Sequence, residues 1–179
     1  MSKDHGIYGL SVDEIVFNFK KLDAILKMEQ YKLEICLIGG TACLLTGLIS
    51  RVTIDYDLLN LDYNPRVRNY LNFFSPYDLV DFEATTIPRS YHERTVIAYK
   101  GEYVICKILS IEDIILSKLC RNLAKDFDDI DKLIKSADMN LVIKLVDEVK
   151  NDIHTRYPRM QENLIVSLDT FSKRYNLVL

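Results

Sequence analysis

The chain has 179 residues, of which 49% are hydrophobic and 27% are charged, a balance typical of a globular protein with a real core. It contains no apolar run of about 18 residues, which excludes a membrane-spanning helix, and its first residues lack the apolar centre of a secretion signal, so we expect a cytoplasmic protein. A net charge of −3 excludes a broadly basic surface for nucleic acids, so any such binding must be local.

The cysteines and histidines do not suggest a metal centre. The cysteines occur in apolar surroundings without C-x-x-C spacing, and the histidines match no ligand pattern. We therefore expect reduced thiols in a cytoplasmic core, in preference to disulfides or zinc ligands. The four cysteines are Cys36, Cys43, Cys106 and Cys120.

The first elements in chain order alternate between helix and strand. A capping box at 11–14 opens an amphipathic helix that reaches residue 26. "KLEICLI" at 32–38 predicts a buried strand, and "TACLLTGL" at 41–48 predicts a short buried helix capped by Thr41. "TIDYDLL" at 53–59 predicts a second strand.

The next elements complete a sheet. Asn64-Pro65 is typical of a helix start, with a cap followed by proline at the first helical position. "YDLVDFEATTI" at 77–87 predicts a third strand. Residues 94–108 predict a hairpin that turns at Lys100-Gly101-Glu102.

The last third of the sequence predicts only helices. Ser110 caps "IEDIILSKLCRNLA", "KDFDDIDKLIKSA" follows, Asn140 starts a helix to about residue 156, and the last begins at Pro158. We therefore predict an α+β fold, with an α/β core at 1–109 and a helical part at 110–179 packed on it as one compact unit.

Two aspartates within the second predicted strand indicate chemistry. Strand side chains alternate between faces, so Arg51, Thr53, Asp55 and Asp57 share one face and leave the other apolar. Two carboxylates about 6–7 Å apart along a strand need a cation to stay charged. Mg²⁺ prefers such oxygen ligands together with nucleotide phosphates. The alternative is a solvent-facing edge strand.

The glycines before these aspartates predict an anion site. A Gly-Gly-Thr turn into a helix exposes unpaired N–H groups, and glycine lets a phosphate approach the backbone. Gly39, Gly40 and the Thr41 hydroxyl are the candidate phosphate contacts. A plain strand-to-helix turn remains the alternative. Two interpretations of Arg51 remain: it contacts a phosphate, or it forms an ion pair with the strand aspartates.

A two-metal site needs a third carboxylate. Asp81 is our candidate because it is another charge inside a strand pattern, and Glu83, on the same face, is the substitute. The chemistry would be in-line attack on the α-phosphate of a nucleoside triphosphate, with a carboxylate taking the acceptor's proton. If neither residue points at Asp55 and Asp57, the two-metal hypothesis loses its third ligand.

The segment "GGTACLLTGLISRVTIDYDLL" resembles the signature of the nucleotidyltransferase (polymerase-β-like) superfamily, in which a glycine pair precedes D-x-D. Three motifs resemble those of the AbiEii-type toxin branch and its uncharacterised relatives. They are the R-x-T-x-D-x-D form of this segment and, downstream, "EDIILSKLCR" and "KDFDDIDKLI". The resemblance covers residues 33 to 136. This chain has Gly40-Thr41 where many active members have serine after glycine.

The resemblance implies roles for particular residues. The glycines, Thr41 and the D-x-D pair would hold nucleotide and a divalent cation, Mg²⁺ or Mn²⁺. Lys118 and Asp126 match the motif positions that complete the active site, and Arg121 matches a softer position in the nucleotide-binding pattern. The alternative for Lys118 is a position along the helix surface, and the alternative for Asp126 is helix capping.

These expectations lead to a leading hypothesis and two rivals. The protein would transfer a nucleotide to a hydroxyl of RNA, such as tRNA, or of a protein, and its physiological role would be that of a toxin neutralised by an antitoxin partner. The first rival is transfer to a small molecule such as an antibiotic, which needs a closed pocket. The second is a catalytically silent relative that binds a nucleotide or a partner.

Overall fold

The computed structural model describes residues 9–50, 53–121 and 123–179. The prediction for Arg51 lies outside these ranges. Among the described residues, no helix combines the length and the hydrophobicity that crossing a bilayer requires.

A five-stranded mixed sheet forms the centre of the first half, and its spatial order is β3-β2-β1-β5-β4. β1 runs parallel to β5, β2 runs parallel to β3, and the pairs β1–β2 and β4–β5 are antiparallel. The strands are β1 (Leu33–Ile38), β2 (Tyr56–Leu59), β3 (Tyr77–Val80), β4 (Val96–Lys100) and β5 (Val104–Ile108).

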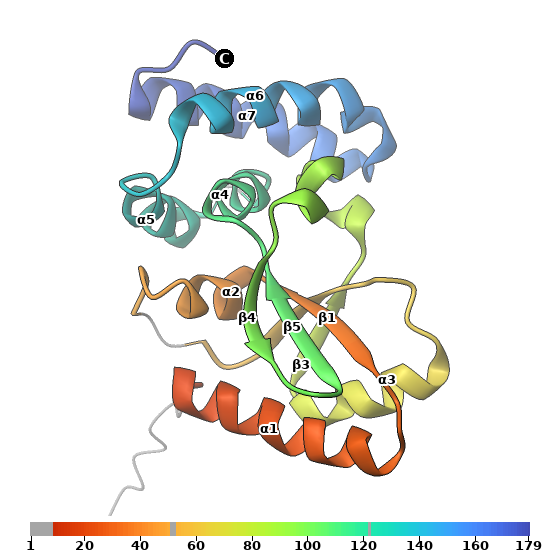
Figure 1. Cartoon of the computed structure of the whole chain (residues 1–179). Helices are drawn as coiled ribbons and strands as arrows, with labels where there is room; N and C mark the ends of the chain where they lie inside the picture. The colour runs from red at the N-terminus through yellow and green to blue at the C-terminus, as the bar shows by residue number, and fades with distance from the viewer. Residues whose placement is uncertain (1–8, 51–52, 122) are drawn as a thin grey trace, which may run out of the picture.

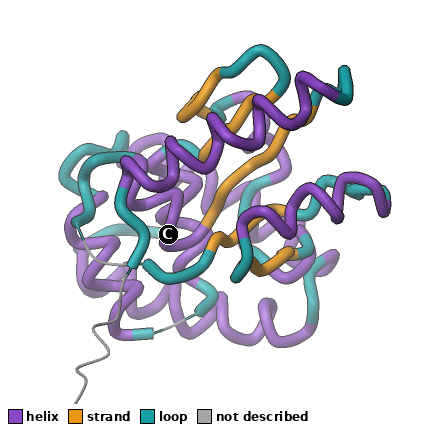
Figure 2. Tube along the Cα trace, turned by 90° about the horizontal axis from the view of Figure 1, so that it is seen from below, coloured by secondary structure: helices purple, strands orange, loops and turns teal. Residues whose placement is uncertain are grey.

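Helices enclose this sheet. α1 and α3 lie on one side of the strands, and α4 to α7 form a helical group on the other (Figure 1). Seen from below, the helices surround the strands on more than one side (Figure 2). The α-helices are α1 (Val12–Met28), α2 (Gly39–Leu45), α3 (Pro65–Leu71), α4 (Ile111–Leu119), α5 (Ala124–Leu133), α6 (Met139–Asp152) and α7 (Pro158–Tyr175). Short 3-10 helices are η1 (Asn72–Phe74), η2 (Phe82–Ala84), η3 (Arg89–Glu93) and η4 (Ile153–Thr155).

The α+β class is therefore confirmed, and amphipathic patterning explains its core. α1 buries Ile15, Phe19, Leu22 and Leu26, spaced three or four residues apart, behind the capping box formed by Ser11 and Glu14. The buried hydrophobic residues of both halves form one continuous cluster. The boundary between 109 and 110 stays a prediction.

Several element limits differ from the sequence prediction. α2 begins at Gly39 with Ile38 at its N-cap, so Thr41 lies inside the helix and does not cap it. The second strand begins only at Tyr56. The third ends at Val80, because the chain then turns into η2. α6 is capped by Asp138, whose carboxylate accepts from two backbone N–H groups, and not by Asn140.

All four cysteines are buried, and none forms a disulfide among the described residues. Burial raises the pKa of Cys36 to about 12 and that of Cys120 to about 11. Because the thiolate is the reactive form, we expect a thiol reagent such as DTNB at pH 8 to leave the native protein unmodified and to label four thiols after denaturation in guanidinium. Rapid labelling of any thiol in the native protein would contradict this burial.

Candidate active site

Three carboxylates meet where β2 and β3 run side by side. Asp57 lies on β2, and the parallel register places Asp78 of β3 directly opposite it. Asp55 immediately precedes β2. One oxygen from each of the three side chains lies within 4.8 Å of the others. Asp55 and Asp57 are partly buried, whereas Asp78 is exposed, so the cluster opens to solvent on the β3 side.

The glycine pair fixes one of these carboxylates. The Gly40 backbone N–H donates to Asp57 Oδ2 at 3.3 Å. Gly39 has φ +59°, and a Cβ built on it would lie 1.8 Å from the same oxygen. Only glycine tolerates both this conformation and this approach. The start of α2 thus receives the protein's own Asp57 carboxylate, and the phosphate contact of the glycine pair stays a prediction.

Thr41 ties the same helix to the segment that leads into β2. Its hydroxyl donates to the Asp55 carbonyl oxygen at 2.7 Å, and the side chain is fully buried. This bond holds the backbone of Asp55 beside α2. Thr41 therefore positions Asp55 in the described structure, and its phosphate contact stays a prediction.

Burial and like charge raise the pKa of Asp57. Burial is the main cause and the neighbouring Asp55 carboxylate the second, while Asp78 acts in the same direction. The Gly40 N–H and the Arg121 guanidinium oppose the rise. A divalent cation is the natural complement of such a cluster, because it neutralises several carboxylates at once.

A small cavity lies beside the cluster. Its volume is about 70 Å³, and its walls include Gly39, Asp57, Lys118 and Arg121. Binding sites for whole small-molecule ligands are usually about 300–1,000 Å³. The cavity therefore has room for one small group and not for a whole small-molecule ligand.

Behind this cavity, Lys118 forms a buried charge cluster with α5. Its ammonium lies 2.8 Å from Asp129 Oδ2 and 3.4 Å from Asp126 Oδ1, and all three side chains are at most 1% exposed. The surface explanation of Lys118 is thereby wrong. Asp126 lies inside α5, whose N-cap is Leu123, so the capping explanation is wrong as well.

Arg121 links this cluster to the cavity. Its Nε lies 3.4 Å from the second oxygen of Asp126, and its side chain is 41% exposed. Asp126 therefore holds a buried lysine and a half-exposed arginine at the same time. Of the cations predicted for the site, Arg121 is the one in the described chain that both lines the cavity and reaches solvent.

The third carboxylate of the cluster belongs to Asp78, and not to Asp81 or Glu83. Asp81 follows β3 and accepts hydrogen bonds from Asn60 at 2.8 Å and Tyr157 at 3.2 Å. Glu83 lies in the η2 turn beyond the strand and is exposed. Asp78 lies inside the predicted third strand. Odd and even positions of a strand face opposite ways, so Asp78 and Asp81 are on different sides of that predicted strand, and only the pairing with β2 shows that Asp78 belongs to the cluster.

A comparison with protein families identifies the family to which the chain belongs. Residues 16–176 match the model of a family described as nucleotidyltransferase of unknown function (DUF6036). The chain belongs to this family. No curated protein and no solved structure matched it. The match supports the nucleotidyltransferase part of the resemblance, but it is not a match to the AbiEii-type branch.

Proposed function

We propose that this protein is a divalent-cation-dependent nucleotidyltransferase that moves a nucleotide from a nucleoside triphosphate to an acceptor hydroxyl. The observation that carries the proposal is the carboxylate cluster of Asp55, Asp57 and Asp78, held against Gly39 and opening to solvent. Membership of a nucleotidyltransferase family supports the reaction class.

The donor set fits Mg²⁺ or Mn²⁺. The cluster offers carboxylate oxygens only, which are the ligands that hard divalent cations prefer. Its exposed side, at Asp78, leaves room for phosphate oxygens to complete the coordination. When bound there, the cation would neutralise charge on the triphosphate and polarise its α-phosphate.

The chain's own residues would orient the reactants and accept a proton. The acceptor oxygen attacks the α-phosphorus, the bond to the bridging oxygen of the β-phosphate breaks, and pyrophosphate leaves. A carboxylate of the cluster takes the hydroxyl proton. Arg121, half exposed beside Asp57, would contact a phosphate, and Lys118 with Asp126 and Asp129 would hold α4 and α5 in place behind it.

The acceptor would be RNA, such as tRNA, or a protein side chain. The open side of the cluster suits an acceptor that approaches from solvent better than a small molecule enclosed in a pocket. A role as a toxin that a cognate antitoxin neutralises is one form of this proposal. Growth arrest on expression, lost in Asp57→Asn, would support that form, and normal growth would oppose it.

Labelled transfer tests the proposal directly. We expect the wild type to label total tRNA or protein from one of the four radiolabelled triphosphates in Mg²⁺ or Mn²⁺. Asp57→Asn and Asp78→Asn should abolish the labelling, because each removes one carboxylate charge from the cluster. Asp62→Asn, on an exposed aspartate outside the cluster, is the matched control and should label like the wild type.

The outcomes separate the alternatives. Equal labelling by wild type and Asp57→Asn would reject the carboxylate cluster as the active site. Labelling lost in Asp57→Asn but kept in Asp78→Asn would reject Asp78 as the third carboxylate. If the wild type labels no macromolecule with any triphosphate, the proposal fails, and the small-molecule enzyme or the silent binding protein takes its place.

A further inference from the structure

A second pocket lies beside the acidic cluster, at the ends of β2 and β3. Its volume is about 200 Å³, and it is lined by Leu59, Asn60, Phe82, Arg89 and Tyr91. Whole small-molecule ligands usually occupy about 300–1,000 Å³, so this pocket suits one part of a ligand. None of the predicted site residues lines it.

The pocket lies at the end of β2, where the consecutive residues Leu59 and Asn60 both line it. Leu59 follows Asp57 by two residues, so both side chains face the same way, about 7 Å apart along the strand. The η2 turn separates the two hollows, since Phe82 lines this pocket and Ala84 lines the small cavity beside Asp57. One sugar ring can span such a spacing.

Flat rings and a guanidinium form the pocket walls. The rings of Phe82 and Tyr91 lie 6.0 Å apart, and the Arg89 guanidinium lies 5.5 Å from the centre of the Phe82 ring. Arg89 also pairs with Asp152 at 3.0 Å and is 56% exposed. Asp152 also pairs at 3.0 Å with the buried Arg156, whose guanidinium lies 3.9 Å from the Phe82 ring centre. One carboxylate therefore serves two guanidinium groups, and the exposed Arg89 offers a planar surface for stacking together with positive charge.

Asn60 adds a hydrogen-bond acceptor. Its Nδ2 donates to Asp81, which also accepts from the Tyr157 hydroxyl. Because Asp81 accepts from the amide nitrogen, the Oδ1 atom of Asn60 faces away from Asp81. This buried Oδ1 has no hydrogen-bond partner within the described residues. An acceptor oxygen disfavours an anion and favours a ligand that carries an N–H group.

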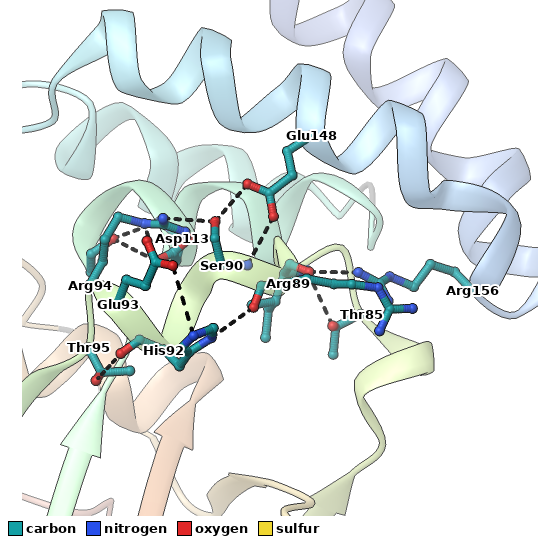
Figure 3. Close-up of polar contacts among 12 residues, drawn as sticks. Thr85, Arg89, Ser90, His92, Glu93, Arg94, Thr95, Asp113, Glu148 and Arg156 are labelled. Atoms are coloured by element: carbon teal, nitrogen blue, oxygen red, sulfur yellow. Dashed lines mark hydrogen bonds and ion pairs between the residues drawn. The ribbon is translucent and has the colours of Figure 1, made fainter.

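The segment that presents Arg89 and Tyr91 is held firmly. Ser90 binds Glu148 of α6 through its backbone N–H at 2.9 Å and its hydroxyl at 2.6 Å, and Arg94 forms two hydrogen bonds with Asp113 of α4 (Figure 3). These contacts fix both ends of η3 to the helical half. The pocket therefore does not depend on a loose loop for its shape.

We propose that this pocket binds a nucleobase, stacked against Phe82 and Arg89 and donating an N–H to Asn60. The inference rests on the function proposed above, because the base would belong to a nucleotide whose phosphates reach Asp57. Asp81 and Tyr157 are then positioning residues that orient Asn60. The base can come from the donor triphosphate or from the acceptor RNA.

Affinity measurements distinguish these sources. Titration calorimetry would use the full chain with each ribonucleoside triphosphate in Mg²⁺ and, separately, with total tRNA. Loss of a base-stacking partner weakens binding by about tenfold, so we expect Arg89→Gln and Asn60→Ala to weaken one probe by this amount. Weaker binding of a triphosphate by the variants would show that the pocket holds the base of the donor. Weaker binding of tRNA alone would show that it holds a base of the acceptor.

Arg66→Gln is the matched control. Arg66 on α3 is 55% exposed, pairs with Glu29 at 3.0 Å and lies 4.7 Å from the Tyr31 ring centre, but it is not in the pocket. It should bind both probes like the wild type. Thermal unfolding of each variant would show that it is folded.

Unchanged affinity for both probes in folded Arg89→Gln and Asn60→Ala would overturn the base pocket, as would the absence of measurable binding by the wild type. If Asp57→Asn still loses labelling, that result rejects the base pocket and leaves the transferase. Weakened binding in the two variants without any labelling by the wild type would reject the transferase and leave the base pocket.

Discussion

Replacing Gly39 with alanine should lower the free energy of unfolding by about 2–5 kcal/mol, combining a left-handed backbone penalty with overpacking. The added Cβ would lie 1.8 Å from Asp57 Oδ2 in a residue at φ +59°. The carboxylate must then move, and a displacement of about 1 Å at a reacting centre can cost about 100-fold in rate. Urea unfolding and the labelling assay would measure the two effects.

Gly47→Ala separates the backbone effect from the contact. Gly47 also has a positive φ, +74°, but a Cβ there would meet nothing within 4 Å. We expect it to cost only the backbone penalty of about 1–2 kcal/mol and to leave labelling intact. Equal effects of the two substitutions on stability and labelling would show that the approach of Gly39 to Asp57 carries no functional constraint.

Replacing Lys118 with methionine should destabilise the protein by about 3–5 kcal/mol, the usual consequence of removing one partner from a buried ion pair. The substitution keeps the length and the apolar part of the side chain but removes the ammonium that Asp126 and Asp129 share. Two buried carboxylates then lose their shared counter-charge. Chemical unfolding monitored by circular dichroism would give the change.

Lys173→Met is the corresponding control at the surface. Lys173 pairs with Asp169 at 2.7 Å, but these side chains are 75% and 63% exposed. Exposed pairs contribute less than about 1 kcal/mol, so this variant should unfold almost like the wild type. If Lys118→Met were equally mild, the lysine would not be the charge that holds α4 against α5.

The difference between Asp78 and Asp81 shows where sequence reasoning about the site reached its limit. Both are aspartates in the stretch predicted as the third strand, and neither has a distinctive local motif. Asp78 enters the cluster because β3 runs parallel to β2 with Asp78 opposite Asp57. Strand register is a long-range property, so local residue patterns do not specify it.

The roles of Lys118 and Thr41 show the same limit of reasoning from the sequence. The sequence predicted both as site residues, but a buried ion pair and a backbone contact depend on how one element packs against another. Lys118 meets residues 8 and 11 positions later, on the next helix, and Thr41 meets the carbonyl of Asp55. Residue type and spacing alone could not show that these groups hold the site together.

The sequence by itself determined the α+β class, the first helix with its capping box and the β4–β5 hairpin, because hydrophobic period, capping and turn residues are local signals. It also placed the glycine pair and D-x-D together, since close spacing along the chain leaves little freedom. Tertiary structure alone decided the third carboxylate, the burial of Lys118 and the pocket of Phe82, Arg89 and Tyr91. Each of these depends on which strands pair and which helices pack, and the residue pattern within one element does not show its packing partner.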